Sequence, residues 1–190
     1  IVNASNVNLI DEFPDKSKVS LILKEDTHYF INEYPDRNNL DIRKQSTNFA
    51  NIPISVDDLR IIFENENFDV ENIDAFVLAP LNCNDFPIQT LTYLKNFNVP
   101  IFISLQGFLR FEGEDNSMVL KLSEDLKYVF EISDTIFMDE VEFDIIKSEK
   151  FYDSNLVVTN GSKGSRIIYV KGKTIKINAV KCNNIVDATG

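Results

Sequence analysis

The sequence is poor in the residues that build disulfide scaffolds, zinc sites and histidine-dependent catalysis. Its 190 residues include two cysteines, Cys83 and Cys182, and one histidine, His28. This content excludes a disulfide scaffold and a Cys/His zinc site, and it argues against a Ser-His-Asp triad. The first residues have neither the basic start nor the apolar stretch of a secretory signal. We therefore expect a cytoplasmic protein in a reducing compartment.

Long apolar runs and an excess of positive charge are also missing. No run approaches the roughly 18 apolar residues of a membrane span, so we expect no membrane association. The formal net charge of -11 argues against nucleic-acid binding. The charge is uneven, however: residues 1–146 carry 11 basic and 27 acidic side chains, whereas residues 147–190 carry 8 and 3. The basic end could bind a small anionic ligand such as a nucleotide, or it could be a solvated hairpin.

Glycine is absent from the first 106 residues, and proline is absent after Pro100. The first half therefore contains neither of the Gly-rich phosphate loops GxGxxG and GxxxxGK[ST]. Any turn that binds phosphate through its backbone must lie near the C-terminus. The hydrophobic content of 44% is ordinary for one globular domain.

The first 54 residues predict mostly β structure. Residues 18–24 (KVSLILK) alternate in polarity and residues 27–31 (THYFI) follow after an acidic pair, which predicts a hairpin with one polar face. A further strand is expected near residues 40–43. Ser55 is then predicted to cap a helix that has Asp57 and Asp58 in its first turn.

Strands and helices alternate from residue 75 onward. Short apolar runs predict strands, helical spacing predicts helices, and Lys171-Gly172-Lys173 predicts the turn of a hairpin. The expected strands are 75–79 (AFVLA, a wholly apolar run typical of a buried parallel strand), 100–105, 135–138, 156–159, 166–170 and 174–177, and the expected helices are 86–97, 123–132 and 140–150. Such alternation indicates a parallel sheet with right-handed crossovers. The chain is thus predicted to have an α/β core over residues 55–190 and a β-rich segment over residues 1–54.

Ligands of open α/β sheets bind beyond the carboxyl ends of the strands, where three segments carry candidate chemistry. The turn TNGSKG, from Thr159 to Gly164, could present backbone N–H groups to an anion or could simply join two strands. Asp139 and Glu142, one helical turn apart, could orient a hydrated magnesium ion or could be favourable charges at a helix start. In the third segment, QGFLR, the arginine could recognise phosphate or carboxylate, or could lie on the surface.

Taken in order, these motifs resemble those of the phosphofructokinase B (ribokinase-like) family of sugar and nucleoside kinases. NNIVDATG matches the first half of the family signature D-T-x-G-A-G-D, with Ala188 at the usual threonine. VVTNGSKG matches its T-x-G-x-x-G turn, and Asp139 starts a version of its N-x-x-E motif. AFVLAPLN and PIFISLQGFLRF look like its P-L-N and D-x-Q-G-F-x-R segments, with Ser104 where aspartate is common. VSLILKEDTHYFINEYPDR resembles its β-sheet lid.

The resemblance implies a three-layer α/β/α fold with a mainly parallel sheet and a small lid, of which the chain is a fragment. It implies ATP-dependent, magnesium-assisted phosphorylation of a hydroxyl group on a sugar, polyol or nucleoside. The implied site residues are Thr159, Gly161, Ser162 and Gly164 for the nucleotide; Asp139 and Glu142 for the metal; Gln106, Arg110 and Asn82 for the substrate; and Thr189 and Gly190 for the anion hole. The catalytic aspartate of the signature would follow Gly190.

Two further expectations remain open. Aspartate at position 139 and the partial signature also fit a non-catalytic kinase-fold protein that binds a ligand or partner, and the residues encoded after Gly190 would discriminate. The apolar side chains Leu21, Leu23, Tyr29 and Ile31 leave one face of the predicted lid hairpin in need of cover. Because an isolated two-stranded ribbon is marginally stable in water, we expect a homodimer formed through the lid.

Overall fold

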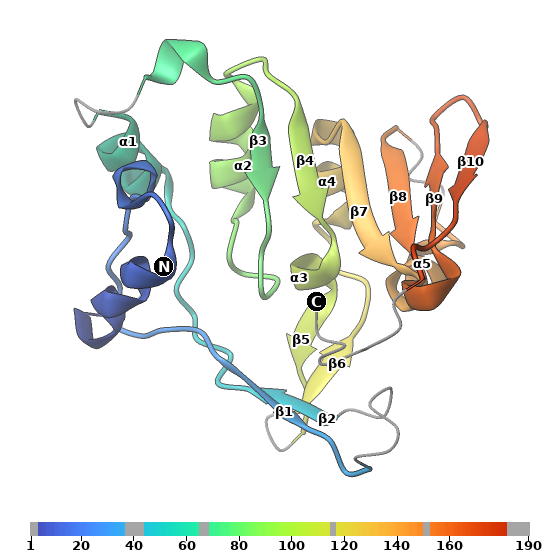
Figure 1. Cartoon of the computed structure of the whole chain (residues 1–190). Coiled ribbons are helices and arrows are strands. Elements are labelled where there is room, and N and C mark those ends of the chain that lie inside the picture. The colour runs from blue at the N-terminus through green and yellow to red at the C-terminus, as the bar shows by residue number, and fades with distance from the viewer. Residues whose placement is uncertain (1–3, 37–43, 65–68, 115–116, 150–152, 182–190) are drawn as a thin grey trace.

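The computed structural model describes residues 4–36, 44–64, 69–114, 117–149 and 153–181. A central sheet dominates the molecule, with helices behind it and small strand pairs below it (Figure 1). The strand expected near residues 40–43 and the expected anion-hole residues Thr189 and Gly190 lie outside the described residues.

The central sheet has six strands in the order β10-β9-β8-β7-β4-β3. Four of them are parallel, as predicted: β3 (Phe76–Leu78), β4 (Ile101–Ser104), β7 (Thr135–Asp139) and β8 (Asn155–Thr159). The hairpin of β9 (Ser165–Ile168) and β10 (Thr174–Ile177) continues the sheet in antiparallel fashion. Its turn contains Gly172, which has a φ of 81°, so the predicted turn is also confirmed.

The helices cover one face of this sheet. They are α1 (Val56–Phe63), α2 (Ile88–Lys95), α4 (Leu126–Ile132) and α5 (Glu140–Ile146). The chain moves in one direction from β3 to β8, so right-handed crossovers place the connecting helices on the same side, behind the sheet in Figure 1. The cap of α1 is the predicted one: Ser55 Oγ accepts from the backbone N–H of Asp58 at 3.1 Å. The described residues thus form two layers of the expected three-layer fold, the sheet and one helical layer.

The core lies between the sheet and these helices. A single row of side chains in register crosses five strands: Leu78, Ile103, Ile136, Leu156 and Ile168. The first four are buried and the last is partly buried. On the opposite face Val77 of β3 is 77% exposed. The expected burial of this strand therefore holds for Leu78 and not for Val77, because no described helix crosses the face of Val77.

The N-terminal segment differs from its prediction. No hairpin joins residues 18–24 to residues 27–31. Instead, β1 (Phe30–Glu33) pairs antiparallel with β2 (Lys44–Thr47), and two 3₁₀ helices, η1 (Ala4–Glu12) and η2 (Lys16–Lys18), precede them. Within the described part of residues 1–54, the named strands are β1 and β2. The alternation at residues 18–24 was misleading because pairing depends on a partner strand that the pattern does not identify.

A second small sheet was not expected from the sequence. It pairs β5 (Arg110–Glu112) with β6 (Met118–Leu120), between β4 and α4. A bridge between Ser46 and Ser117 connects β2 to this hairpin. Both small sheets lie below the carboxyl ends of the parallel strands in Figure 1. Within the described residues, no helix has the length and apolar character needed to cross a bilayer.

Candidate functional site

The predicted site segments lie at one edge of the sheet, because the parallel strands all end there. β4 leads into a short helix, α3 (Gln106–Leu109), β7 leads into α5, and β8 leads into the turn η5 (Gly161–Lys163). Since β4, β7 and β8 are neighbours in the sheet, the segments that follow them are neighbours too. The structure thus brings together motifs that are far apart in the sequence.

Asp139 and Glu142 form a capping box at the start of α5. Asp139 Oδ1 accepts from the backbone N–H of Glu142 at 2.8 Å, and Glu142 Oε2 accepts from the backbone N–H of Asp139 at 2.9 Å. Glu142 is 4% exposed, and this burial raises the pKa of its carboxyl, although the Asp139 N–H, Arg110 and Gln106 partly oppose the shift. Asp139 is exposed. One carboxylate is therefore open to a ligand, and the other lies behind it.

This pair fits a hydrated magnesium ion better than a directly coordinated one. Magnesium usually keeps several waters and takes only one or two carboxylates from the protein. Among the described residues, no group of three or more His, Cys, Asp or Glu side chains is placed to hold a metal ion. The exposed carboxylate of Asp139 is suited to contact such an ion or its waters, while Glu142 fixes the orientation of Asp139 through the cap.

The turn after β8 lies directly beside Asp139. β7 and β8 pair in a register that sets Asp139 next to Thr159. A cavity of about 350 Å³ separates the start of α5 from the turn; its lining consists of Asp139, Glu140, Val141, Thr159, Asn160, Gly161, Ser162 and Lys163. The predicted metal ligand and three predicted nucleotide residues therefore share one cavity.

Gly161 and Gly164 of this turn are glycines for different structural reasons. Gly161 has a φ of 46°, and a Cβ added there would meet nothing within 4 Å, so the backbone is open to a ligand. Gly164 has a φ of 93°, and a Cβ there would lie 2.1 Å from the carbonyl oxygen of Ile177. Gly164 is thus required by the packing of β10, whereas Gly161 is required only by its backbone angle.

Positive charge gathers next to Gly164. A second cavity, of about 190 Å³, includes Lys163, Arg166 and Lys176 in its lining. Arg166 forms a bidentate ion pair with Glu140 at 2.5 and 2.9 Å, which lowers the pKa of Glu140 and raises that of Arg166. Lys163 lines both cavities, whereas Lys176 lines only the smaller one beside the turn. The charge asymmetry was the signal that could have identified them.

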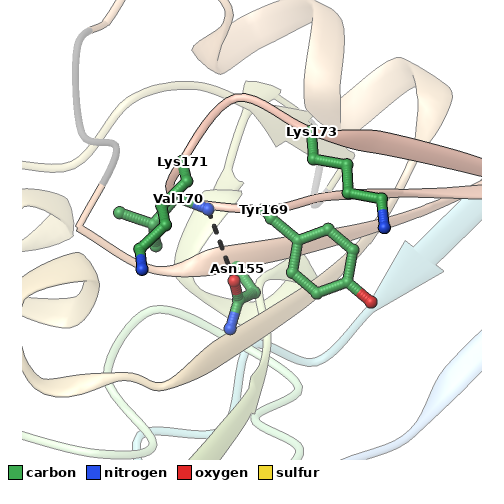
Figure 2. A pocket seen from close by; sticks show the side chains of 5 residues that line it. All are labelled: Asn155, Tyr169, Val170, Lys171 and Lys173. Atoms are coloured by element: carbon green, nitrogen blue, oxygen red, sulfur yellow. Dashed lines mark hydrogen bonds between the residues drawn. The ribbon is translucent and has the colours of Figure 1, made fainter.

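Two further lysines of this region lie elsewhere. Figure 2 shows Lys171 beside Val170 and Lys173 beside Tyr169 at a cavity of about 470 Å³, where the backbone N–H of Val170 donates to Asn155 Oδ1 at 3.4 Å. Asn155 begins β8, so this cavity lies at the opposite end of the strand from the turn. It is not part of the candidate site.

Gln106 and Arg110 follow β4 and Asn82 follows β3, so they come from strands on the side of β7 away from β8 and its turn. Arg110 is only 6% exposed, and its guanidinium lies 4.7 Å from the ring centroid of Phe30 on β1. The alternative of a surface arginine is therefore wrong. Asn82 is 4% exposed and uses its amide within the protein: Nδ2 donates to the carbonyl of Ala50 at 3.2 Å, and Oδ1 accepts from the backbone N–H of Asn84 at 2.8 Å. A substrate contact of Asn82 remains a prediction.

Sequence reasoning missed His28, which contacts Asn82 from the N-terminal segment. Its Nδ1 lies 3.4 Å from Asn82 Nδ2, and its ring centroid lies 5.0 Å from that of Phe30. The sequence offered one signal: the only histidine of the chain occurs within the aromatic stretch THYF. Its part in the site is taken up below.

Comparison with known proteins shows the fold. No model of a protein family matches the sequence, and no curated protein sequence matches it. Among solved structures, a pyrophosphate-dependent kinase in the ribokinase family with bound sulfate superposes with a TM-score of 0.73 at 18% identity, over 93% of this chain and 62% of that one. The complex of a pyrophosphate-dependent ribokinase-family kinase with a pyrophosphate analogue and myo-inositol gives 0.70 at 17% identity, with the same coverage. The chain therefore has a ribokinase-like fold and spans about three fifths of the length of these structures.

Proposed function

We propose that the protein transfers a phosphoryl group from ATP to a hydroxyl group of a sugar, polyol or nucleoside. The observation that carries this proposal is the row of groups along one sheet edge: the open turn at Gly161, the Asp139–Glu142 pair, and the buried Arg110, which packs against Phe30 of β1. A donor phosphate chain that starts at the turn would run past Asp139 toward Arg110. The fold shared with ribokinase-family kinases supports this assignment.

In this proposal each group of the chain has a defined task. The backbone of the turn, together with Thr159, Gly161, Ser162 and Gly164, binds the donor phosphates. Lys163 balances their charge, and Asp139 orients a hydrated magnesium ion, which neutralises phosphate charge when bound. Gln106 and Arg110 orient the acceptor or the transferred group. The general base is proposed to be an aspartate outside residues 1–190, next to Thr189 and Gly190 in the anion hole.

Inorganic pyrophosphate is a second candidate donor. The solved structures with TM-scores of 0.73 and 0.70 are pyrophosphate-dependent kinases. In this chain, Lys163 and Lys176 line the small cavity beside the turn, and two ammonium groups suit a compact, highly charged anion. Both donors use the same phosphate-binding turn, so the choice between them leaves the reaction class unchanged.

A donor and acceptor panel tests the proposal. The protein expressed from its complete reading frame would be assayed with ATP or pyrophosphate, with ribose, myo-inositol or inosine, and with or without magnesium. We expect phosphorylation of at least one acceptor and loss of activity in Asp139→Ala. If no donor–acceptor pair reacts but calorimetry detects ligand binding, the protein is a non-catalytic binding protein. In that case Asp139 would serve only as the cap of α5.

We also propose that the protein is a homodimer through the lid, formed here by β1 and β2 with the segment before them. Leu23, Tyr29 and Ile31, three of the four apolar side chains named from the sequence, are 56%, 52% and 51% exposed, which supports this proposal, whereas Leu21 is partly buried. Sedimentation should give a dimer that dissociates in Ile31→Asp. A wild-type monomer at micromolar concentration would contradict this arrangement.

A further inference from the structure

His28 lies between the N-terminal segment and the α/β body and contacts both. Its Nε2 lies 3.2 Å from Thr47 Oγ1 on β2, and its Nδ1 lies 3.4 Å from Asn82 Nδ2 in the loop after β3. The ring is half-buried and packs against Phe30, the residue that lies under the Arg110 guanidinium. A continuous set of contacts thus leads from Asn82 through His28 and Phe30 to Arg110.

The surrounding hydrogen bonds define the protonation state of this ring. Asn82 Oδ1 accepts from the Asn84 N–H, and Asn82 Nδ2 donates to the Ala50 carbonyl, so the amide orientation is fixed. An amide nitrogen can only donate, and therefore Nδ1 of His28 must accept from it. The assigned state is a neutral imidazole whose Nε2–H donates to Thr47.

The Asn82 loop is itself held rigidly. The Asp85 carboxylate accepts from the backbone N–H groups of Leu81 and Asn82 at 2.6 and 3.1 Å. On the other side, Lys24 forms an ion pair of 2.6 Å with Asp58 at the start of α1. Of these two polar contacts between the N-terminal segment and the body, only the one at His28 involves a group whose ordinary pKa lies near neutral pH.

The charges around His28 favour the neutral ring. Burial lowers the pKa of His28, and the positive charge of Arg110 on β5 acts in the same direction. The carboxylates of Asp85 and Asp26 and the carbonyl of Ala50 oppose this shift without reversing it. The imidazole is accordingly uncharged at neutral pH.

We propose that neutral His28 is a positioning residue of the acceptor site, which fastens β1 and β2 to the Asn82 loop and so holds Phe30 against Arg110. The acceptor part of this inference rests on the proposed function. Protonation would place a second N–H on Nδ1, which could then no longer accept from Asn82 and would instead turn toward the Ala50 carbonyl, so the bond to Asn82 would be lost. Acceptor affinity should then fall in acid while donor affinity, which depends on the turn after β8, should not.

The connection can be tested without any activity. Residues 1–190 contain one histidine, and His28→Asn identifies its NMR signals in the protein expressed from its complete reading frame. We expect His28 to titrate below its ordinary value of 6.5, and we expect Asn82→Ala to move the midpoint back toward 6.5. Amide signals of Phe30 and Thr47 should follow the same midpoint. A titration midpoint of His28 at or above 6.5, or amide signals of Phe30 and Thr47 that do not change with the protonation of His28, would overturn the inference.

Kinetics then test the acceptor role. His28→Ala should raise the acceptor KM about 3- to 10-fold, the value of one hydrogen bond, and leave the donor KM within about twofold. His28→Asn keeps an acceptor near the Nδ1 position and cannot ionise, so it should restore affinity and abolish the pH dependence of the acceptor KM. Tyr128→Phe, which removes the 2.7 Å bond between Tyr128 and Thr92 in the helical layer, is the matched control and should change neither KM.

The outcomes separate this inference from the proposed function. Parallel changes in donor and acceptor KM would mean a general folding defect and would overturn the positioning role. If the protein phosphorylates nothing, the proposed function and the acceptor role both fail, while the NMR titration still decides whether His28 fastens the N-terminal segment.

Discussion

Replacing Gly107 by alanine tests the packing that supports Gln106 and Arg110. Gly107 lies in α3, where a Cβ would come within 2.4, 2.5 and 2.6 Å of the O, C and Cβ atoms of Pro80. Carbon atoms in contact are normally about 3.5–4.0 Å apart, so the overlap is about 1 Å. Two of the three atoms are backbone, and Phe108 and Leu109 of the same helix are buried, so neither side can move freely.

Two effects of opposite sign decide the magnitude. Alanine is favoured over glycine within a helix by about 1 kcal/mol. Overpacking against a rigid neighbour costs about 3 kcal/mol at the upper end of its usual range. The steric effect wins, and the free energy of unfolding should fall by about 2 kcal/mol. With a urea m-value of about 2 kcal/mol/M, the midpoint should fall by about 1 M.

Urea unfolding followed by circular dichroism measures this change, and Gly113→Ala provides the matched control. A Cβ at Gly113 would lie 2.7 Å from Val119 Cγ1 and 2.8 Å from Ser117 Oγ, which are side-chain ends that can rotate away. Its midpoint should move by less than half as much. A Gly107→Ala protein as stable as the wild type would refute the reasoning, because propensity would then outweigh the contact with Pro80.

Three further predictions concern the candidate site. Gly161→Val should weaken donor binding by about one to two orders of magnitude in calorimetry, because valine disfavours a φ of 46° and the turn loses aligned N–H contacts. Gly172→Val, equally open and also at positive φ, should leave donor affinity unchanged, and equal weakening by both would contradict the assignment. The pKa of the Glu142 carboxyl is raised in the folded state, so above pH 4.5, the ordinary pKa of a glutamate, the folded protein holds this proton more tightly than the unfolded protein does. The stability that this carboxyl contributes is therefore lost as the pH rises above 4.5. Glu142→Gln should therefore gain stability relative to wild type between pH 4 and pH 7 in urea titrations, yet lose magnesium-dependent activity; a relative loss of stability over that interval would show that the buried charge is stabilising. Finally, residues 1–190 alone should transfer no phosphate from labelled ATP to any acceptor, and measurable transfer would mean that the general base lies within them.

Local sequence signals predicted the α/β core well. Short apolar runs such as AFVLA and LVVT became β3 and β8, and Ser55 capped α1. These signals suffice to locate strands and helices because an apolar run, a helix cap and a turn each involve only a few consecutive residues. Consecutive parallel strands then lie next to one another, and right-handed crossovers place the helices between them on one side of the sheet.

The N-terminal segment could not be predicted in the same way. Alternation in residues 18–24 suggested a strand, but β1 starts at Phe30 and takes β2 as its partner. The hairpin of β5 and β6 and its bridge to β2 were not recognised either. Short edge strands carry weak patterns, and their pairing is decided by contacts between residues far apart in the chain.

The sequence by itself determined that the candidate residues Asp139, Glu142 and Gly161 follow the ends of predicted strands. Only the tertiary structure decided which of these candidates lie together and how deeply each is buried. It buried Glu142 and Arg110, paired Arg166 with Glu140, and placed His28 against Asn82. The physical reason is that burial and charge pairing depend on neighbours brought in from other elements, which no local pattern in the chain specifies.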